Sequence, residues 1–78
     1  MLDGLSWYPN VGKGPYRLEG LSFDQIEWSL SDAGGRTLDK GSLKGEPSKT
    51  FDWSLDAGIY FLDLHLNGAF RRLKLFVP

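Results

Sequence analysis

Hydrophobic and polar residues alternate along two β-prone runs near the end of the chain, and Asn67-Gly68 separates these runs. An Asn-Gly pair in this setting predicts a two-residue type I′ turn, because both central residues of that turn need a positive φ. The turn places Leu66 opposite Ala69 and fixes the pairing of all the residues before and after it. The sequence therefore predicts a β-hairpin on which the rest of the chain packs.

Alternation sorts the side chains of this hairpin onto two faces. One face is apolar and is expected to belong to the core: Tyr60, Leu62, Leu64, Leu66, Leu73 and Leu75. The other face mixes aromatic with charged residues: Ile59, Phe61, Asp63, His65, Phe70, Arg72, Lys74 and Phe76. Asp63 is expected opposite Arg72, as a cross-strand ion pair that stabilises a hairpin by about 0.2–1 kcal/mol. A shift of one residue would break this pair and turn the leucines outward, so the pattern fixes the register.

Shorter alternating segments precede the hairpin, and turns rich in Gly, Pro and Asp separate them. We expect strands at residues 5–8, 16–19, 26–31, 36–40 and 50–55, with at most a short strand at 42–43. Apolar residues do not recur at helical spacing, so helix is expected only as a single turn near residues 21–25 or 55–58. Short strands at a spacing of roughly 8–12 residues predict an all-β fold, an Ig-like antiparallel β-sandwich of about seven short strands.

The bulky residues that lie in phase on these strands are expected to form one core between two sheets. They are Trp7, Tyr16, Leu18, Ile26, Trp28, Leu30, Leu38, Phe51, Trp53, Tyr60, Leu62, Leu64, Leu73, Leu75 and Val77. Residues 5–78 are expected to form a single domain, after a residual linker at residues 1–4. A chain of 78 residues buries only about 60% of its unfolded surface, so its stability is expected to be modest.

Composition narrows the chemistry of the chain. It contains no cysteine, which excludes disulfides, thiolate chemistry and cysteine-based metal sites. The net charge of −1 argues against nucleic-acid binding. The longest apolar run is far shorter than a transmembrane segment, and no hydrophobic stretch of a signal peptide begins the chain. His65 is the only histidine, which leaves it without a histidine partner for a zinc site or a catalytic triad. We therefore expect no catalytic residues, no metal and no cofactor.

Four segments carry a resemblance to a known family. They are residues 8–14 (YPNVGKG), which include Pro9, Asn10 and Gly14; residues 26–40, which include Gly35 and Arg36; residues 53–62 (WSLDAGIYFL), which include Gly58 and Tyr60; and the last strand, residues 72–77 (RLKLFV). In this order they resemble the C-terminal sorting domains of the bacterial type IX secretion system. Val11 stands where that family usually has a second proline, and the segment before Gly58 is about one residue shorter.

The resemblance implies a function for the chain. A domain of this family lies at the C-terminal end of an exported protein, whose signal peptide is at the other end. It is recognised by components of the outer-membrane translocon and is then removed by a sortase-like cysteine peptidase at the cell surface. The expected localisation is therefore secreted or cell surface, with no nucleic-acid partner and no transmembrane segment.

The expected partner-binding residues lie on the last two strands: Phe61, Arg72, Lys74, Phe76 and Val77. In the family the lysine of the terminal strand belongs to the recognition motif, which is the reason for choosing Lys74. The alternative is an ordinary solvent-facing lysine whose stem covers Phe61. In another alternative, the first strand or the loop at residues 41–47 covers the aromatic residues of this face. A free last strand would also allow β-augmentation by a partner or an edge-strand dimer.

Other functions remain open from the sequence. Gly58 and Tyr60 also have a structural explanation. Gly58 would adopt a positive φ at the start of a strand, and Tyr60 would form a tyrosine corner. The three tryptophans would form a sugar-binding platform if they were exposed and coplanar, so a carbohydrate-binding or adhesive module is the alternative function. A small accessory domain that packs on a catalytic neighbour is a third possibility. An enzyme is the least favoured class.

Overall fold

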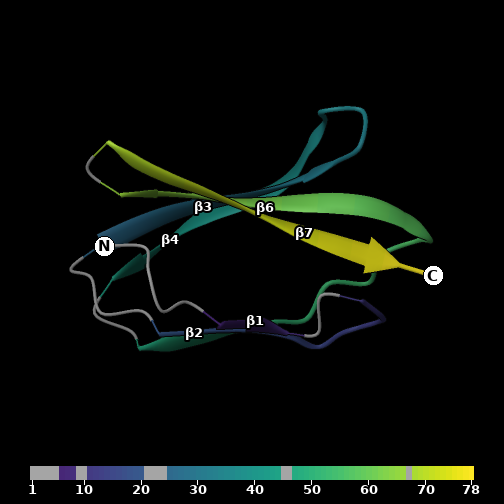
Figure 1. Cartoon of the computed structure of the whole chain (residues 1–78), viewed down its shortest axis with the longest axis horizontal. Coiled ribbons are helices and arrows are strands. Elements are labelled where there is room, and N and C mark those ends of the chain that lie inside the picture. Colours follow the sequence, from purple (N-terminus) through teal and green to yellow (C-terminus); the bar gives the residue numbers. More distant parts are fainter. Residues whose placement is uncertain (1–5, 9–10, 21–24, 45–46, 67) are drawn as a thin grey trace.

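Seven strands form two antiparallel sheets in the computed structural model, which describes residues 6–8, 11–20, 25–44, 47–66 and 68–78. One sheet has the order β1-β2-β5: β1 (Ser6–Tyr8), β2 (Tyr16–Glu19) and β5 (Ser48–Phe51). The other has the order β4-β3-β6-β7: β4 (Thr37–Lys44), β3 (Gln25–Asp32), β6 (Gly58–Leu66) and β7 (Ala69–Val77). The sheets form two layers (Figure 1), and the described residues contain no helix.

The strand order is that of an Ig-like sandwich. The first, second and fifth strands share one sheet, while the third, sixth and seventh share the other, and β4 lies beside β3. The predicted all-β, Ig-like antiparallel sandwich of about seven short strands is confirmed.

The hairpin has the predicted register. Pairing runs from Gly58 opposite Val77 to Leu66 opposite Ala69, and Asp63 faces Arg72. Asn67 lies outside the described residues, and its neighbour Gly68 has a φ of +85°. The turn dipeptide and the alternation of the flanking runs were therefore sufficient to fix every pair in this hairpin.

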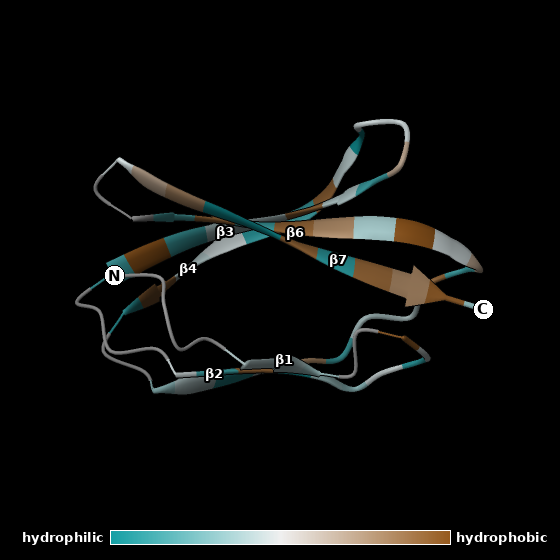
Figure 2. Ribbon diagram, in the orientation of Figure 1, coloured by the Kyte–Doolittle hydropathy of each residue, from teal (hydrophilic) through white to brown (hydrophobic). Residues whose placement is uncertain are grey.

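The core lies between the two sheets and is built from the inward-facing side of each strand. Figure 2 shows the alternation of hydrophobic and hydrophilic residues as bands along β6 and β7. The fully buried side chains come from both layers: Tyr16, Leu18, Ile26, Leu30, Leu62, Leu64, Leu75 and Val77. Most of the predicted core residues are buried or half-buried, and Leu38 is the exception.

Leu38 is exposed because β4 contains a β-bulge. Leu30 pairs with Asp39, while Ser31 pairs with Thr37, which leaves Leu38 as the extra residue between them. A bulge interrupts the alternation of side chains, so Leu38 falls out of phase with the core. The prediction that Leu38 belongs to the core is wrong for this reason.

β4 is also longer than the sequence predicts. The strand continues from Thr37 to Lys44 without a break, although a loop with at most a short strand was expected after Lys40. Gly41 lies opposite Trp28, and a Cβ atom on Gly41 would come within 2.9 Å of the indole ring. The glycine thus allows a close approach between a strand and a large core side chain, and it does not end the strand.

β5 is displaced toward the N-terminus relative to the expected strand at residues 50–55, because it ends at Phe51. Trp53 follows outside the strand, yet its indole stacks on Phe51 with ring centroids 4.4 Å apart. Its Nε1 donates a hydrogen bond to Asp39 Oδ2 at 3.1 Å. The alternation in this segment therefore predicts the burial of Trp53 correctly, although Trp53 does not belong to a strand.

The segment after β1 crosses from the three-stranded sheet to the other one. Val11 forms a parallel bridge with Phe76, and the Gly12 amide donates to the Phe76 carbonyl at 2.9 Å. This contact occupies the C-terminal end of the outer edge of β7. The last strand is therefore not free at this end, and β-augmentation or an edge-strand dimer, which the sequence left open, is restricted to the rest of the edge.

Candidate binding surface

The outer face of the four-stranded sheet carries the mixed set of aromatic and charged residues. Phe70, Phe76 and Ile59 are exposed, at 52%, 42% and 36% of their surface. β1 packs in the other sheet, and it does not cover these side chains. The alternative in which the first strand covers this face is wrong; of the expected loop at residues 41–47, residues 41–44 belong to β4, and residues 45–46 lie outside the described residues. The face instead exposes apolar side chains at its two ends, Phe70 near the β6–β7 turn and Phe76 with Ile59 at the other end, with charged residues between them.

Arg72 organises the centre of this face. Its guanidinium donates two hydrogen bonds to Asp63, from Nε at 2.8 Å and from a terminal nitrogen at 3.1 Å. This pair raises the pKa of Arg72, mainly because Asp63 accepts its hydrogen bonds. The same guanidinium lies 5.0 Å from the ring centroid of Phe61 and 5.9 Å from that of Phe70. Arg72 thus holds two aromatic rings in place by cation–π contact.

Lys74 lies opposite Phe61 in the hairpin and is exposed. Its ammonium forms no ion pair with another residue in the described part of the chain. Phe61 is half-buried, and the cation placed over its ring is Arg72, at the distance given above. Lys74 therefore has its charged end available to a partner.

Val77 does not belong to the surface. Its side chain is 1% exposed and lies in the core, opposite Gly58 across the hairpin. The prediction that Val77 binds a partner is wrong, because the pleat turns this residue inward while Phe76 points outward.

Several described residues of the family resemblance lie near the end of β7: Gly58 pairs with Val77, and Tyr60 pairs with Leu75 and with Asp32 beside the β3–β4 turn. Gly35 and Arg36 lie in or beside the β3–β4 turn, where Asp32 Oδ1 accepts hydrogen bonds from the amides of Gly34 and Arg36. Gly14 packs against the ring of Tyr16. Pro9 and Asn10 lie outside the described residues. The described members of this set shape turns, which gives them a structural role.

Tyr60 forms a tyrosine corner. Its hydroxyl donates to the Asp56 carbonyl at 2.7 Å, and its ring is buried at the start of β6. Gly58 has a φ of +156°, a conformation that other residues rarely adopt. The structural explanation of these two residues is confirmed.

The tryptophans do not form a platform. Trp28 is buried, while Trp7 and Trp53 are half-buried against the core. The plane of Trp53 is tilted by 54° from that of Trp7 and by 57° from that of Trp28. A flat sugar ring therefore finds no coplanar set of indoles here.

The outer face of the three-stranded sheet is polar and internally bonded. Arg17 donates to Glu19, to Ser48 Oγ at 3.1 Å and to Thr50 Oγ1 at 3.2 Å. The hydrogen bond from Arg17 lowers the pKa of Glu19, and a second bond from Tyr8 adds to this effect. The bond to Glu19 in turn raises the pKa of Tyr8. This face has few polar groups left for a partner.

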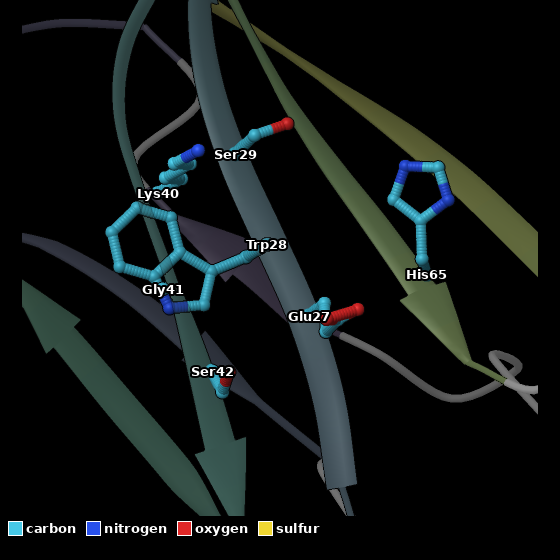
Figure 3. A pocket seen from close by; sticks show the side chains of 7 residues that line it. All are labelled: Glu27, Trp28, Ser29, Lys40, Gly41, Ser42 and His65. Carbon is cyan, nitrogen blue, oxygen red and sulfur yellow. The ribbon is translucent and has the colours of Figure 1, made fainter.

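A hollow on the four-stranded sheet was missed at the level of sequence. It has a volume of about 480 Å³ and is lined by residues of β3, β4 and β6 (Figure 3). Its lining depends on which residues of β4 face β3, and the bulge at Leu38 determines that pairing. No pattern in the local sequence marks this pairing.

No family model matches the chain, and no curated protein matches it. In the described part of the chain there is no group of three or more metal-ligating side chains that could hold an ion. The same residues contain no helix that could span a membrane.

Proposed function

We propose that this domain is a non-enzymatic recognition module that directs the protein carrying it through the outer-membrane translocon of a type IX secretion system. The proposal rests on the ordered resemblance of four segments to the sorting domains of that system. Its contact surface is the outer face of β6 and β7. The observation that supports this surface most strongly is the exposure of Phe76 and Ile59 in the row next to Lys74, which lacks an ion-pair partner among the described residues.

The chemistry of this face suits protein recognition. Phe76 and Ile59 lie side by side across the hairpin, and both are exposed. Their burial by a partner is favourable at about 25 cal/mol per Å² of apolar surface. Lys74 adds a charge that selects an acidic group on the partner and steers the encounter. Aromatic anchors next to a cation are typical of binding hot spots.

The sandwich supplies the rigidity that this recognition needs. The inward side chains of β7, such as Leu75 and Val77, are locked in the core. The backbone that carries the outward side chains is therefore fixed, so binding costs side-chain entropy but little backbone entropy.

Processing follows recognition in this proposal. The translocon component binds the folded domain, the attached cargo crosses the outer membrane, and a sortase-like cysteine peptidase cuts the linker before about Asp3. The domain itself needs no cofactor for this role. The cargo is then secreted or held at the cell surface.

The experiment is export of a reporter fused in front of this domain, behind a signal peptide, in a bacterium that has the type IX system. We expect Phe76→Ser and Lys74→Ala each to leave a larger share of the reporter in the periplasm. Leu38→Ser and Lys44→Ala are matched controls, since both residues are exposed on β4 of the same sheet. Each control should be exported like the wild type.

Deleting the last residues is a poor test, because the deletion removes Leu75 and Val77 from the core and unfolds the domain. The surface substitutions avoid this problem. Retention of the wild-type fusion in the periplasm, with the domain folded, would contradict the proposal. Equal export of the face variants and the controls would move the contact to another surface.

A further inference from the structure

The hollow on the four-stranded sheet arises from an alternation of short and long side chains. Ser42, Glu27 and His65 face one another in one row across β4, β3 and β6. Lys40 and Ser29 face each other in the next row. In Figure 3, Trp28 and Glu27 lie between the two serines, and His65 stands apart on β6. The volume of about 480 Å³ falls within the range of about 300–1,000 Å³ that is typical of small-molecule sites.

The lining offers hydrogen-bond donors and acceptors together. The Glu27 carboxylate accepts, the Lys40 ammonium donates, and the hydroxyls of Ser29 and Ser42 do both. The charges of Glu27 and Lys40 offset each other. A ligand with many hydroxyl groups matches this set, because each hydroxyl both donates and accepts.

His65 lines one side of the hollow, and Phe70 lies beyond it on β7. His65 and Phe70 are paired across β6 and β7, with ring centroids 4.9 Å apart and planes at 57°. Phe70 is the most exposed aromatic side chain of this face. An exposed aromatic ring offers apolar surface to the C–H face of a pyranose ring.

Other ligand classes fit the lining less well. Among the described residues, Glu27 is the only carboxylate that lines the hollow, which is too few for a divalent cation. An anion would gain Lys40 but would lie against the negative charge of Glu27. An apolar ligand would take water away from both charged groups without replacing its hydrogen bonds.

We propose that this hollow binds a neutral oligosaccharide, held by Glu27, Lys40, Ser29 and Ser42 and packed against His65 and Phe70. The site shares the outer face of β6 and β7 with the proposed sorting surface, but its centre is on β3 and β4. It lies toward the β6–β7 turn, two rows or more from the row that contains Phe76 and Ile59. It also differs from the tryptophan platform, which the core arrangement of the indoles rules out.

The test is a titration of the ¹⁵N-labelled protein, followed by amide chemical shifts. The probes are cellotetraose, maltotetraose, mannotetraose and the N-acetylated chitotetraose, with inorganic phosphate as the anion probe. We expect at least one tetrasaccharide to give saturable shifts at the amides of Ser29, Lys40 and Ser42. Ser42→Phe, which fills the hollow, should abolish these shifts. Lys44→Met, on the same strand outside the hollow, should leave them unchanged.

A second pair of variants guards against misfolding of Ser42→Phe. Glu27→Gln and Lys40→Met keep the shape of the side chain, and each should weaken sugar binding at least tenfold. The proposal is overturned if none of the four sugars shifts these amides, or if phosphate shifts them while the sugars do not. Phe76→Ser should keep sugar affinity and lose export, so the two proposals fail separately.

Discussion

The two outer faces of the sandwich use their side chains in opposite ways. On the three-stranded sheet, Arg17 bonds to Glu19, Ser48 and Thr50, so donors and acceptors satisfy one another. On the four-stranded sheet, Phe70 and Phe76 stand in solvent, and Lys74 has no ion-pair partner among the described residues. Both faces belong to one small domain with one core, so the difference does not come from the fold.

This difference indicates which face gains from a partner. A polar group that is already bonded gains little, because each new hydrogen bond replaces an existing one. An exposed aromatic ring has no such competing contact, and its burial removes apolar surface from water. The four-stranded sheet is therefore the face that we assign to binding.

The largest effect is expected from a core substitution, because it destabilises the whole domain and therefore both outer faces. Leu62 is fully buried on β6, and Leu62→Ala should lower the free energy of unfolding by about 2–5 kcal/mol. Leu38→Ala, at the exposed bulge, should change it by less than about 0.5 kcal/mol. Urea denaturation measures both. Similar losses for the two variants would contradict the assignment of Leu62 to the core and Leu38 to the surface.

A smaller effect is expected at the tyrosine corner. Tyr60→Phe removes one hydrogen bond to a part-buried carbonyl and should cost about 0.5–1.5 kcal/mol. Tyr8→Phe is the matched control on the three-stranded face, where the tyrosine is exposed, and it should cost less. The same denaturation assay compares them. A larger loss at Tyr8 would show that the exposed network stabilises the domain more than the corner does.

The ion pair on the binding face is expected to contribute less again. A double-mutant cycle with Asp63→Asn and Arg72→Met should give a coupling energy of about 0.2–1 kcal/mol, because Arg72 is largely exposed. The cycle is measured by denaturation at low and at high salt. A coupling energy that does not fall with salt would mean that the pair is shielded from solvent.

The smallest effect concerns the pH dependence of the three-stranded face. The pKa of Glu19 is lowered in the folded protein by the hydrogen bond from Arg17. Its contribution to stability is thus present above the ordinary value of 4.5 and is lost as the pH falls through the lowered pKa. Glu19→Gln should flatten this acid limb of the stability curve. If stability falls with decreasing pH in Glu19→Gln as it does in the wild type, Glu19 does not cause this pH dependence.

The hairpin illustrates what the sequence alone can predict. Asn67-Gly68 and the alternation around it fix a register in which Asp63 meets Arg72, and the structure has that register. The turn residues and the single buried face are sufficient to predict the register of this hairpin, because no bulge interrupts either strand. The same alternation identifies Phe76 and Lys74 as outward residues.

The β3–β4 pair illustrates the limit. A single extra residue, Leu38, shifts the pairing of β4 with β3, and nothing in the local sequence marks the bulge. The hollow depends on that shifted pairing, so a reading of the sequence could not find it. The parallel bridge of Val11 with Phe76 is similarly hidden, because it joins residues from opposite ends of the chain.

The most direct test compares one double variant on each outer face in the same export assay. Lys74→Ala with Phe76→Ser alters the four-stranded face, and Tyr8→Ser with Thr50→Ala alters the three-stranded face; these residues are all exposed. We predict that the first variant leaves the reporter in the periplasm while the second is exported like the wild type, with both domains folded. Export of the first variant at the wild-type level, or retention of the second alone, would contradict the assignment of the binding face.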